Sequence, residues 1–310
     1  MFEKEQEQII SSLSGEQAAQ SWIVIGPKGV GKEIFAKGVI SHLTHTVSEY
    51  NKAAKWISCG LTETAKNEIQ KNILSGNNIE DKNWAKKTHI TVDDVREGNK
   101  FLALTSQEIR ILVFNLADDM NENAQNALLK TLEEPYPNTL ILLLCESIGH
   151  LLPTILSRCK KLYLNAPTKE DFQITILKKH PNLSAQEINE LAFLSGNTIG
   201  QAEHILSLNG LDLYHRLLNL LQSHHIETSS LLAFVEEAAK DNNLYLLLKT
   251  FLLKQLSSDT EQAALQNLAH AYEKSLTYDK IKKLFDQVET INLDKKQVLI
   301  SSITHIREAL

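Results

Sequence analysis

The chain has 310 residues, of which 43% are hydrophobic and 23% charged, a composition that predicts a soluble globular protein of two or three domains. Its formal net charge of −6 excludes a protein that coats nucleic acid through its overall charge, while local basic patches leave nucleic acid open as a partner. The three cysteines, Cys59, Cys145 and Cys159, are widely spaced and odd in number, which excludes a disulfide framework and a cysteine-rich zinc module.

The chain begins with a polar segment, residues 2–7 (FEKEQE), which lacks the apolar core of a signal peptide. The longest apolar run, Leu140 to Cys145, is far shorter than a membrane span. Together with the cysteine spacing, these features predict a cytoplasmic protein that has no contact with a membrane.

The first half of the chain alternates short apolar runs with helical patterns, which predicts βαβ units and a mostly parallel sheet. One helix is expected from Asn123 to Glu134, where Pro135 stops it, and another from about Pro153 to Ser157. Residues 59–100 are polar and irregular, and we expect loops and short helices there. The predicted strands are Trp22–Ile25, Ile111–Phe114, Thr139–Cys145 and Leu162–Leu164.

After Pro167 the strand signals stop and helical patterns take over. Residues 168–208 predict a small helical unit, and Leu-rich patterns from about Leu211 onward predict an all-helical C-terminal region. The chain is therefore expected to form three domains. They cover residues 1–166, 167–208 and 209–310.

A phosphate-binding loop is predicted between the first strand and the helix that follows it. Residues 26–33 (GPKGVGKE) fit the Walker A pattern G-x-x-x-x-G-K-[ST] at every position except the last. Backbone N–H groups and the helix N-terminus would attract a phosphate group, and Lys32 would neutralise its charge. The candidate nucleotide-binding residues are Gly26, Gly29, Gly31, Lys32 and Glu33.

The positions that hold Mg²⁺ in a P-loop ATPase are changed in this chain. Glu33 replaces the hydroxyl residue of the loop, and its negative charge repels a nucleotide even though a carboxylate can bind Mg²⁺. Asn115 and Leu116 stand where an acidic pair normally holds the metal and polarises water. Asp118 and Asp119 follow in what we expect to be a solvated loop, beyond reach of the metal. The sequence therefore predicts a P-loop fold that does not hydrolyse ATP by itself. It requires no cofactor, and weak or structural binding of ATP or ADP is left open.

Two further motifs carry a family resemblance. Residues 126–135 (NALLKTLEEP) and residues 155–159 (ILSRC) follow the phosphate loop at a characteristic spacing. With the run at residues 92–96 (VDDVR), they resemble the AAA+ clamp-loader ATPases of DNA replication over roughly residues 20–165.

The resemblance implies an α/β RecA-like AAA+ domain with a parallel sheet, followed by a helical lid and an all-helical collar that oligomerises. It implies a DNA polymerase III clamp loader in which gamma/tau subunits hydrolyse ATP and delta is a further partner. Such a complex opens the sliding clamp and loads it onto primer-template DNA. By the same resemblance Arg158, between Ser157 and Cys159, acts as an arginine finger in a neighbouring subunit's ATP site. By its position alone, Arg158 is equally a surface cation near a helix end.

The chain departs from this family in two places. Many relatives carry a four-cysteine zinc module after the phosphate loop, whereas this stretch contains Cys59 alone, so no metal is predicted. His42 and His45 have helical spacing but no further ligand nearby, and they are interpreted as a surface pair. Catalytic members have a polar sensor after the strand that ends near Leu144 and an arginine in the lid. Here Cys145 and Glu146 follow that strand, and residues 195–202 contain no arginine.

Three functions remain open from the sequence. The leading one is a clamp-loader subunit that has no catalytic activity alone and assists ATP hydrolysis by a partner within the polymerase complex. The alternative is a catalytically active clamp-loader-type AAA+ ATPase, in which Glu33 and Asp118 or Asp119 replace the usual metal ligands. The third is a free-standing DNA-binding AAA+ adaptor, which the net charge disfavours.

Overall fold

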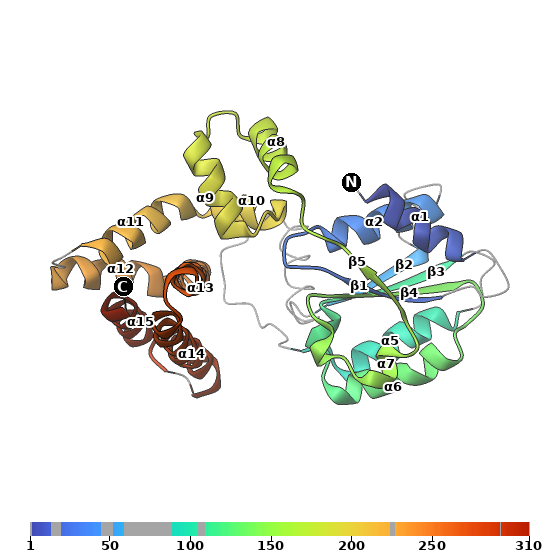
Figure 1. The fold of residues 1–310 in the computed structure, drawn as a ribbon. Coiled ribbons are helices and arrows are strands. Elements are labelled where there is room, and N and C mark those ends of the chain that lie inside the picture. The colour runs from blue at the N-terminus through green and yellow to red at the C-terminus, as the bar shows by residue number, and fades with distance from the viewer. Residues whose placement is uncertain are drawn as a thin grey trace, which may run out of the picture. The chain divides into compact units, whose positions relative to one another are not determined.

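The computed structural model describes residues 2–13, 20–44, 52–58, 89–104, 109–223, 227–291 and 293–309. Contacts between residues divide the chain into two units, Met1–Ala166 and Pro167–Leu310 (Figure 1). Each unit has a hydrophobic core of its own, which is the first requirement for an independent domain.

Five parallel strands form the sheet of the first unit, in the order β2-β3-β4-β1-β5. Every residue of β1 and β4 is buried, because these strands are central and helices cover both faces of the sheet (Figure 1). The parallel sheet predicted from the apolar runs is therefore confirmed. The strands are β1 (Ser21–Ile25), β2 (Ala54–Ser58), β3 (Arg110–Asn115), β4 (Thr139–Cys145) and β5 (Lys160–Tyr163).

Side chains of the sheet alternate between two hydrophobic layers. Leu140 and Leu142 pack with α1 (Glu3–Ser12) and α2 (Lys32–Leu43), whereas Ile141 and Leu143 pack with the helices of the other face. Those helices are α5 (Val92–Leu102), α6 (Glu122–Glu133) and α7 (Pro153–Leu156), and two short 3₁₀ turns, η1 (Ala117–Asp119) and η2 (Ile148–His150), lie beside them.

The bounds of α6 and α7 follow from local signals in the sequence. Asn121 begins α6, since its side chain accepts a hydrogen bond from the backbone N–H of Ala124 at 2.9 Å, and α6 ends shortly before Pro135. Pro153 is the first residue of α7, where its missing N–H costs nothing. Both predicted helices are thus present within one or two residues of their expected bounds.

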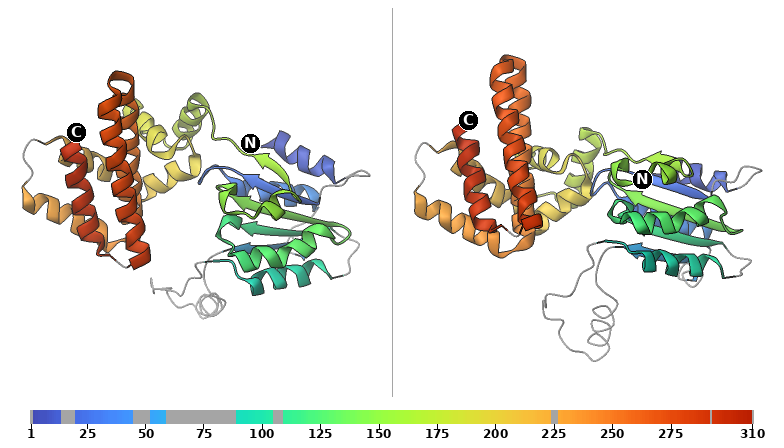
Figure 2. Two further views of the ribbon diagram at one scale, coloured as in Figure 1. Left: turned by 60° about the horizontal axis from the view of Figure 1, so that its bottom comes forward. Right: turned by 90° about the horizontal axis from the view of Figure 1, so that it is seen from below.

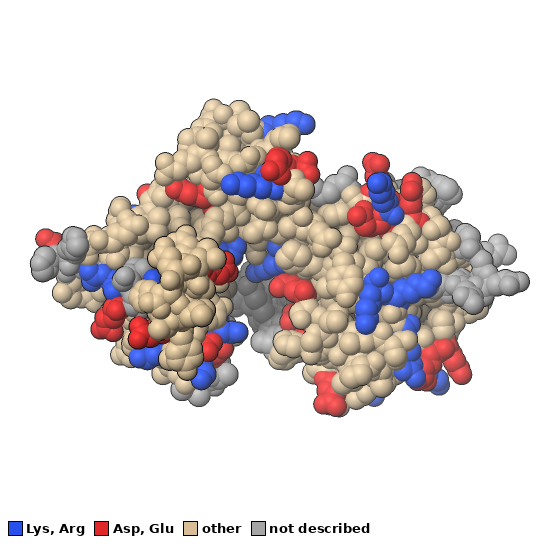
Figure 3. Space-filling view, viewed as in Figure 1, with Lys and Arg blue, Asp and Glu red and all other residues tan. Residues whose placement is uncertain are grey.

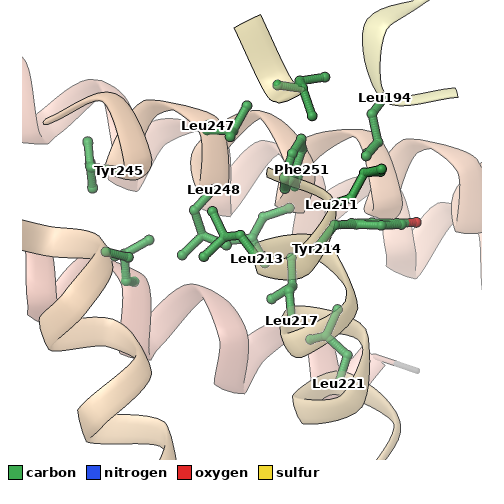
Figure 4. Packing of buried hydrophobic residues seen from close by; sticks show 14 of the residues in the cluster. Leu194, Leu211, Leu213, Tyr214, Leu217, Leu221, Tyr245, Leu247, Leu248 and Phe251 are labelled. Atoms are coloured by element: carbon green, nitrogen blue, oxygen red, sulfur yellow. The ribbon is translucent and has the colours of Figure 1, made fainter. Parts of the chain in front are cut away.

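The second unit consists of helices packed around one hydrophobic core, from Phe172 to Ile306. Figure 4 shows part of it, where Leu211 and Tyr214 of α11 lie close to Phe251 of α13, with the Tyr214 and Phe251 ring centroids 5.5 Å apart. The predicted all-helical class of this region is confirmed. Its helices are α8 (Lys169–Lys179), α9 (Ala185–Ser195), α10 (Ile199–Ser207), α11 (Gly210–Gln222), α12 (Thr228–Lys240), α13 (Asn242–Gln266), α14 (Leu268–Ile291) and α15 (Lys295–Ala309).

The division of these helices into a lid and a collar stays a prediction. Ile205 of α10, Leu211 of α11 and Leu247 of α13 belong to the same core, and Ile205 and Leu247 both lie beside Gly210. The core therefore continues across residue 208. Figure 2 shows α13 and α14 side by side as a long antiparallel hairpin. Within the described segments, no helix combines the length and the apolar character that a bilayer crossing requires.

We expect limited proteolysis of the native chain to distinguish a continuous helical core from a separate lid and collar. Among the described segments, the first cut should fall at residues 165–168, which join β5 to α8 without regular structure. The helical fragment should then resist further cleavage, because its core is continuous. Mass spectrometry of the fragments identifies the sites. A first cut at residues 207–212 would contradict the continuous core and favour an independent lid.

Candidate functional site

The predicted phosphate loop joins β1 to α2, at the carboxyl end of the parallel strands. Gly29 (φ 78°) and Gly31 (φ 106°) have left-handed backbone conformations, which strain any residue with a Cβ atom. A Cβ atom at Gly26 would lie 2.7 Å from the carbonyl oxygen of Leu164. The backbone itself therefore requires glycine at all three positions, as a loop that curls around a phosphate group does.

Lys32, the first residue of α2, hydrogen-bonds to the loop that precedes it. Its Nζ donates to the carbonyl oxygens of Gly26 at 2.5 Å and Pro27 at 3.1 Å, and the residue is only 7% exposed. Burial lowers the pKa of Lys32, while the nearby carboxylates of Glu146 and Asp118 oppose this shift. A bound phosphate would have to compete with the two loop carbonyls for the ammonium group.

The two positions that depart from the ATPase pattern contact each other. The side-chain amide of Asn115, through Nδ2, donates a hydrogen bond of 2.6 Å to Oε1 of Glu33. In P-loop ATPases the residues at these positions hold Mg²⁺ between them. Here a direct hydrogen bond joins the first turn of α2 to the end of β3. Each departure is visible in the sequence, but their contact is visible only in the structure.

Asp118 does not lie in a solvated loop, and that expectation was wrong. Its Oδ2 accepts hydrogen bonds from the backbone N–H groups of Glu146 at 2.9 Å and Ser147 at 3.3 Å, directly after β4. The turn η1 carries the chain from β3 to the end of the neighbouring strand β4, and this brings Asp118 against that backbone. Its other oxygen, Oδ1, is buried and has no hydrogen-bond partner within the described residues. Asp118 is thus already engaged with the protein backbone.

The expected absence of a metal site stays a prediction. Within the described part of the chain, no group of three or more His, Cys, Asp or Glu side chains is placed to hold a metal ion. His42 is exposed near the end of α2, as expected of a surface residue. Cys59 and His45 lie outside the described residues, as do most of the residues from 59 to 100 that were interpreted as loops and short helices.

Arg158 lies directly after α7 and is held by three acceptors of its own domain. Nη1 donates to the carbonyl oxygen of Thr154 at 3.0 Å and to Oγ of Ser157 at 3.3 Å. Nη2 forms an ion pair of 2.6 Å with Oε1 of Glu133, the last residue of α6. The side chain is still 34% exposed, so it is accessible from solvent while its charge is paired.

Gln125 connects α6 with the segment before α7, and sequence reasoning did not find it. Its Nε2 donates to the carbonyl oxygens of Met120 at 3.1 Å and His150 at 2.9 Å, and its Oε1 accepts from the N–H of Leu152 at 2.8 Å. These bonds position the start of α7 and therefore Arg158. The signal in the sequence was a polar side chain on the helix face of Leu128, where an apolar one is expected.

Cys145 and Cys159 are both buried, at 0% and 8% exposure. Burial raises the pKa of each thiol to about 12. Cys159 is thus a small buried residue, and in the run of residues 157–159 only Arg158 combines charge with exposure.

Comparison with known proteins identifies relatives of the chain. The model of a family described as "DNA polymerase III, delta subunit" matches residues 2–168. The chain is 30% identical over 201 residues to the DNA polymerase III subunit delta' of Pseudomonas aeruginosa, an alignment that covers 62% of this chain and 58% of that protein. It is 42% identical over 101 residues to the subunit delta' of Haemophilus influenzae, covering 32% of this chain and 31% of that protein. The chain thus matches less than two thirds of the length of these relatives.

A solved structure extends the comparison to the whole fold. The crystal structure of a DNA polymerase III, gamma subunit-related protein from Thermotoga maritima aligns with 99% of this chain and 98% of its own, with a TM-score of 0.56. At 16% sequence identity this shows a shared fold. The predicted fold class, an α/β P-loop domain followed by a helical region, is confirmed.

The buried thiols lead to a test of the packing on one face of the sheet, because both belong to the hydrophobic layer that includes residues of α5, α6 and α7. With a pKa of about 12, only about one thiol in 10⁴ is ionised at pH 8, and the thiolate is the reactive form. We expect Cys145 and Cys159 to resist iodoacetamide in the native protein and to react fully in denaturant, as measured by peptide mass spectrometry. Fast labelling of either residue in the native state would show that its layer of the core is open.

Proposed function

Because the chain belongs to the DNA polymerase III delta subunit family, we propose that it serves in a DNA replication clamp loader as a subunit that does not hydrolyse ATP. The family match confirms the clamp-loader resemblance seen in the motifs, and several similar relatives are named DNA polymerase III subunit delta'. The hydrogen bond between Glu33 and Asn115 carries the proposal for the chain's own site.

The geometry of the phosphate loop supports the absence of hydrolysis. For Mg²⁺ to bind, the bond from Asn115 to Glu33 would have to break, and the Glu33 carboxylate would then stand beside the negative phosphates. Leu116 offers no acid to polarise a water molecule, and Asp118 is bonded to the backbone after β4. These contacts disfavour the alternative of an active ATPase, in which Asp118 would serve as a metal ligand.

The chain needs no cofactor in this role. The glycine loop keeps the conformation of a phosphate site, so ATP or ADP bound there would be a structural ligand. Zinc has no part in the proposal, and no binding residue for it is assigned.

Arg158 is proposed to act in the ATP site of a neighbouring gamma/tau subunit. Its guanidinium group is partly exposed and lies at the end of a short helix that Gln125 anchors to α6. Such a group can stabilise the charge that develops on a γ-phosphate, a role that needs a planar fork of donors. Ser157 supports it as one of its hydrogen-bond acceptors.

The helical unit offers a surface for the other subunits, proposed here to be gamma/tau and delta. Apolar side chains at the end of α13 and along the first turns of α14 are exposed in the described structure. They are Leu265, Leu268, Tyr272 and Leu276, with exposures of 90%, 79%, 64% and 51%. Apolar side chains grouped in this way are typical of protein interfaces. We assign these side chains to contacts with the collar helices of neighbouring subunits.

The sliding clamp and primer-template DNA are proposed as partners of the complex. Figure 3 shows basic and acidic side chains on both units, and in this view neither unit presents an extended face of one sign. With a net charge of −6, the isolated chain is not expected to bind DNA tightly. DNA contact is therefore assigned to the assembled loader, and the free-standing adaptor is disfavoured.

A nucleotide-binding experiment tests the state of the phosphate loop. The isolated chain should show no ATP turnover above background. The double variant Glu33→Thr with Asn115→Asp restores the hydroxyl and the acid that hold Mg²⁺, and it moves the negative charge from the phosphate loop to the end of β3. Its affinity for Mg²⁺-ATP should therefore rise at least about tenfold. Calorimetric titration with and without Mg²⁺ measures this. Wild-type turnover that disappears on Lys32→Ala would contradict the proposal.

A reconstituted clamp loader tests the role of Arg158. Arg158→Ala should reduce hydrolysis at the one site it serves by about 10³-fold or more, so that total ATPase falls partly while clamp loading falls much further. Arg158→Lys should restore little of the lost hydrolysis and clamp loading, because an ammonium group cannot form the planar fork of donors. Both variants should assemble normally, since a half-exposed pair adds little to stability. If an intact complex that carries Arg158→Ala loads clamps at the wild-type rate, Arg158 is not an arginine finger.

A further inference from the structure

We infer that Glu133 is a positioning residue for Arg158, which holds the guanidinium group against its own domain until the phosphate of a neighbouring subunit replaces the carboxylate. This inference rests on the proposed role of Arg158 and adds a second residue, with an opposite charge, to it. The sequence motif at residues 126–135 contains Glu133, but no function proposed above uses this residue.

The contacts of the guanidinium group point to such an exchange. Of its three acceptors, the carbonyl oxygen of Thr154 and Oγ of Ser157 are neutral, and only the carboxylate of Glu133 is charged. Carboxylate and phosphate oxygens occupy the same place in front of an arginine fork. A phosphate that approaches Arg158 therefore competes with Glu133 for Nη2.

The backbone on both sides of the pair is fixed by buried residues of the first unit, so the fold itself brings Glu133 and Arg158 together. Glu133 follows Leu128 and Leu132, which are buried against the sheet and orient the last turn of α6. Arg158 follows α7, whose start Gln125 fixes by its bonds to His150 and Leu152. The side chains themselves are 49% and 34% exposed, which leaves the guanidinium group able to leave the pair when a stronger acceptor arrives.

The exposure of the pair sets the size of the expected effect. Half-exposed ion pairs shift an equilibrium by about two- to fivefold. Removing the charge of Glu133 should therefore raise the fraction of Arg158 that is free to engage a phosphate by about this factor. If the pair served only to join α6 and α7, removing it would change the thermal stability of this chain and leave ATP hydrolysis by the partner subunit unchanged.

The test is the ATPase rate of the reconstituted complex, without and with sliding clamp and primer-template DNA. Glu133→Gln should raise unstimulated hydrolysis at the site that Arg158 serves about two- to fivefold. The total unstimulated rate should therefore rise by a smaller factor, and the ratio of stimulated to unstimulated rates should fall. Glu134→Gln is the matched control, because it makes the same change one residue later, on an exposed side chain for which the described structure shows no ion pair. This control should leave both rates unchanged.

Combination with Arg158→Ala separates this inference from the function on which it rests. Glu133→Gln should have no effect on ATPase when Arg158 is already Ala, since it acts only through that residue. If Arg158→Ala lowers hydrolysis while Glu133→Gln leaves or lowers the unstimulated rate, the holding role is wrong and the arginine finger stands. If Arg158→Ala itself changes neither hydrolysis nor loading, the finger is wrong. Thermal unfolding of each isolated variant checks that it is folded.

Discussion

Parallel pairing of β1, β3 and β4 places the carboxyl ends of three strands at one edge of the sheet, and the properties proposed for the phosphate loop depend on this arrangement. The glycine loop follows β1, Asn115 ends β3, and Glu146 follows β4. Because burial on both faces requires these strands to be apolar throughout, polar side chains can enter the sheet only at its ends. Lys32 and the carboxylates of Glu146 and Asp118 therefore lie together at this edge, whether or not the site binds a nucleotide.

The retained backbone and the changed side chains at this edge have different physical requirements. Gly26, Gly29 and Gly31 are required by a close approach and by positive φ angles, so the loop conformation depends on the glycines themselves. The Mg²⁺-holding positions have no such structural requirement. Here Glu33 and Asn115 satisfy each other directly, which keeps α2 attached to β3 by a hydrogen bond in the place of a metal bridge. The fold therefore accommodates both departures from the ATPase pattern through a direct contact between the two side chains.

The face of the sheet that carries α6 and α7 combines two roles for polar side chains. Gln125 is 3% exposed and makes three hydrogen bonds, so it acts as a fixed connection between the two helices. Glu133 and Arg158 form a partly exposed pair at the ends of the same helices. The buried hydrogen bonds of Gln125 fix the position of α7, and the partly exposed ion pair leaves the guanidinium group of Arg158 accessible. A residue that acts on another subunit needs both properties.

The sequence by itself determined the features that depend on local spacing. Apolar runs predicted the parallel strands, glycines at fixed intervals predicted the phosphate loop, and Pro135 and Pro153 predicted the bounds of two helices. It also revealed that the Mg²⁺-holding residues are missing. The edge strand β2 was not predicted, because its residues are mostly half-buried and lack a long apolar run. Tertiary structure alone decided which changed residues meet. The bond from Asn115 to Glu33 spans 82 residues, and Asp118 finds its partners after β4. The register of the sheet and the packing of α6 against α7 set such contacts, and no local pattern in the sequence records them.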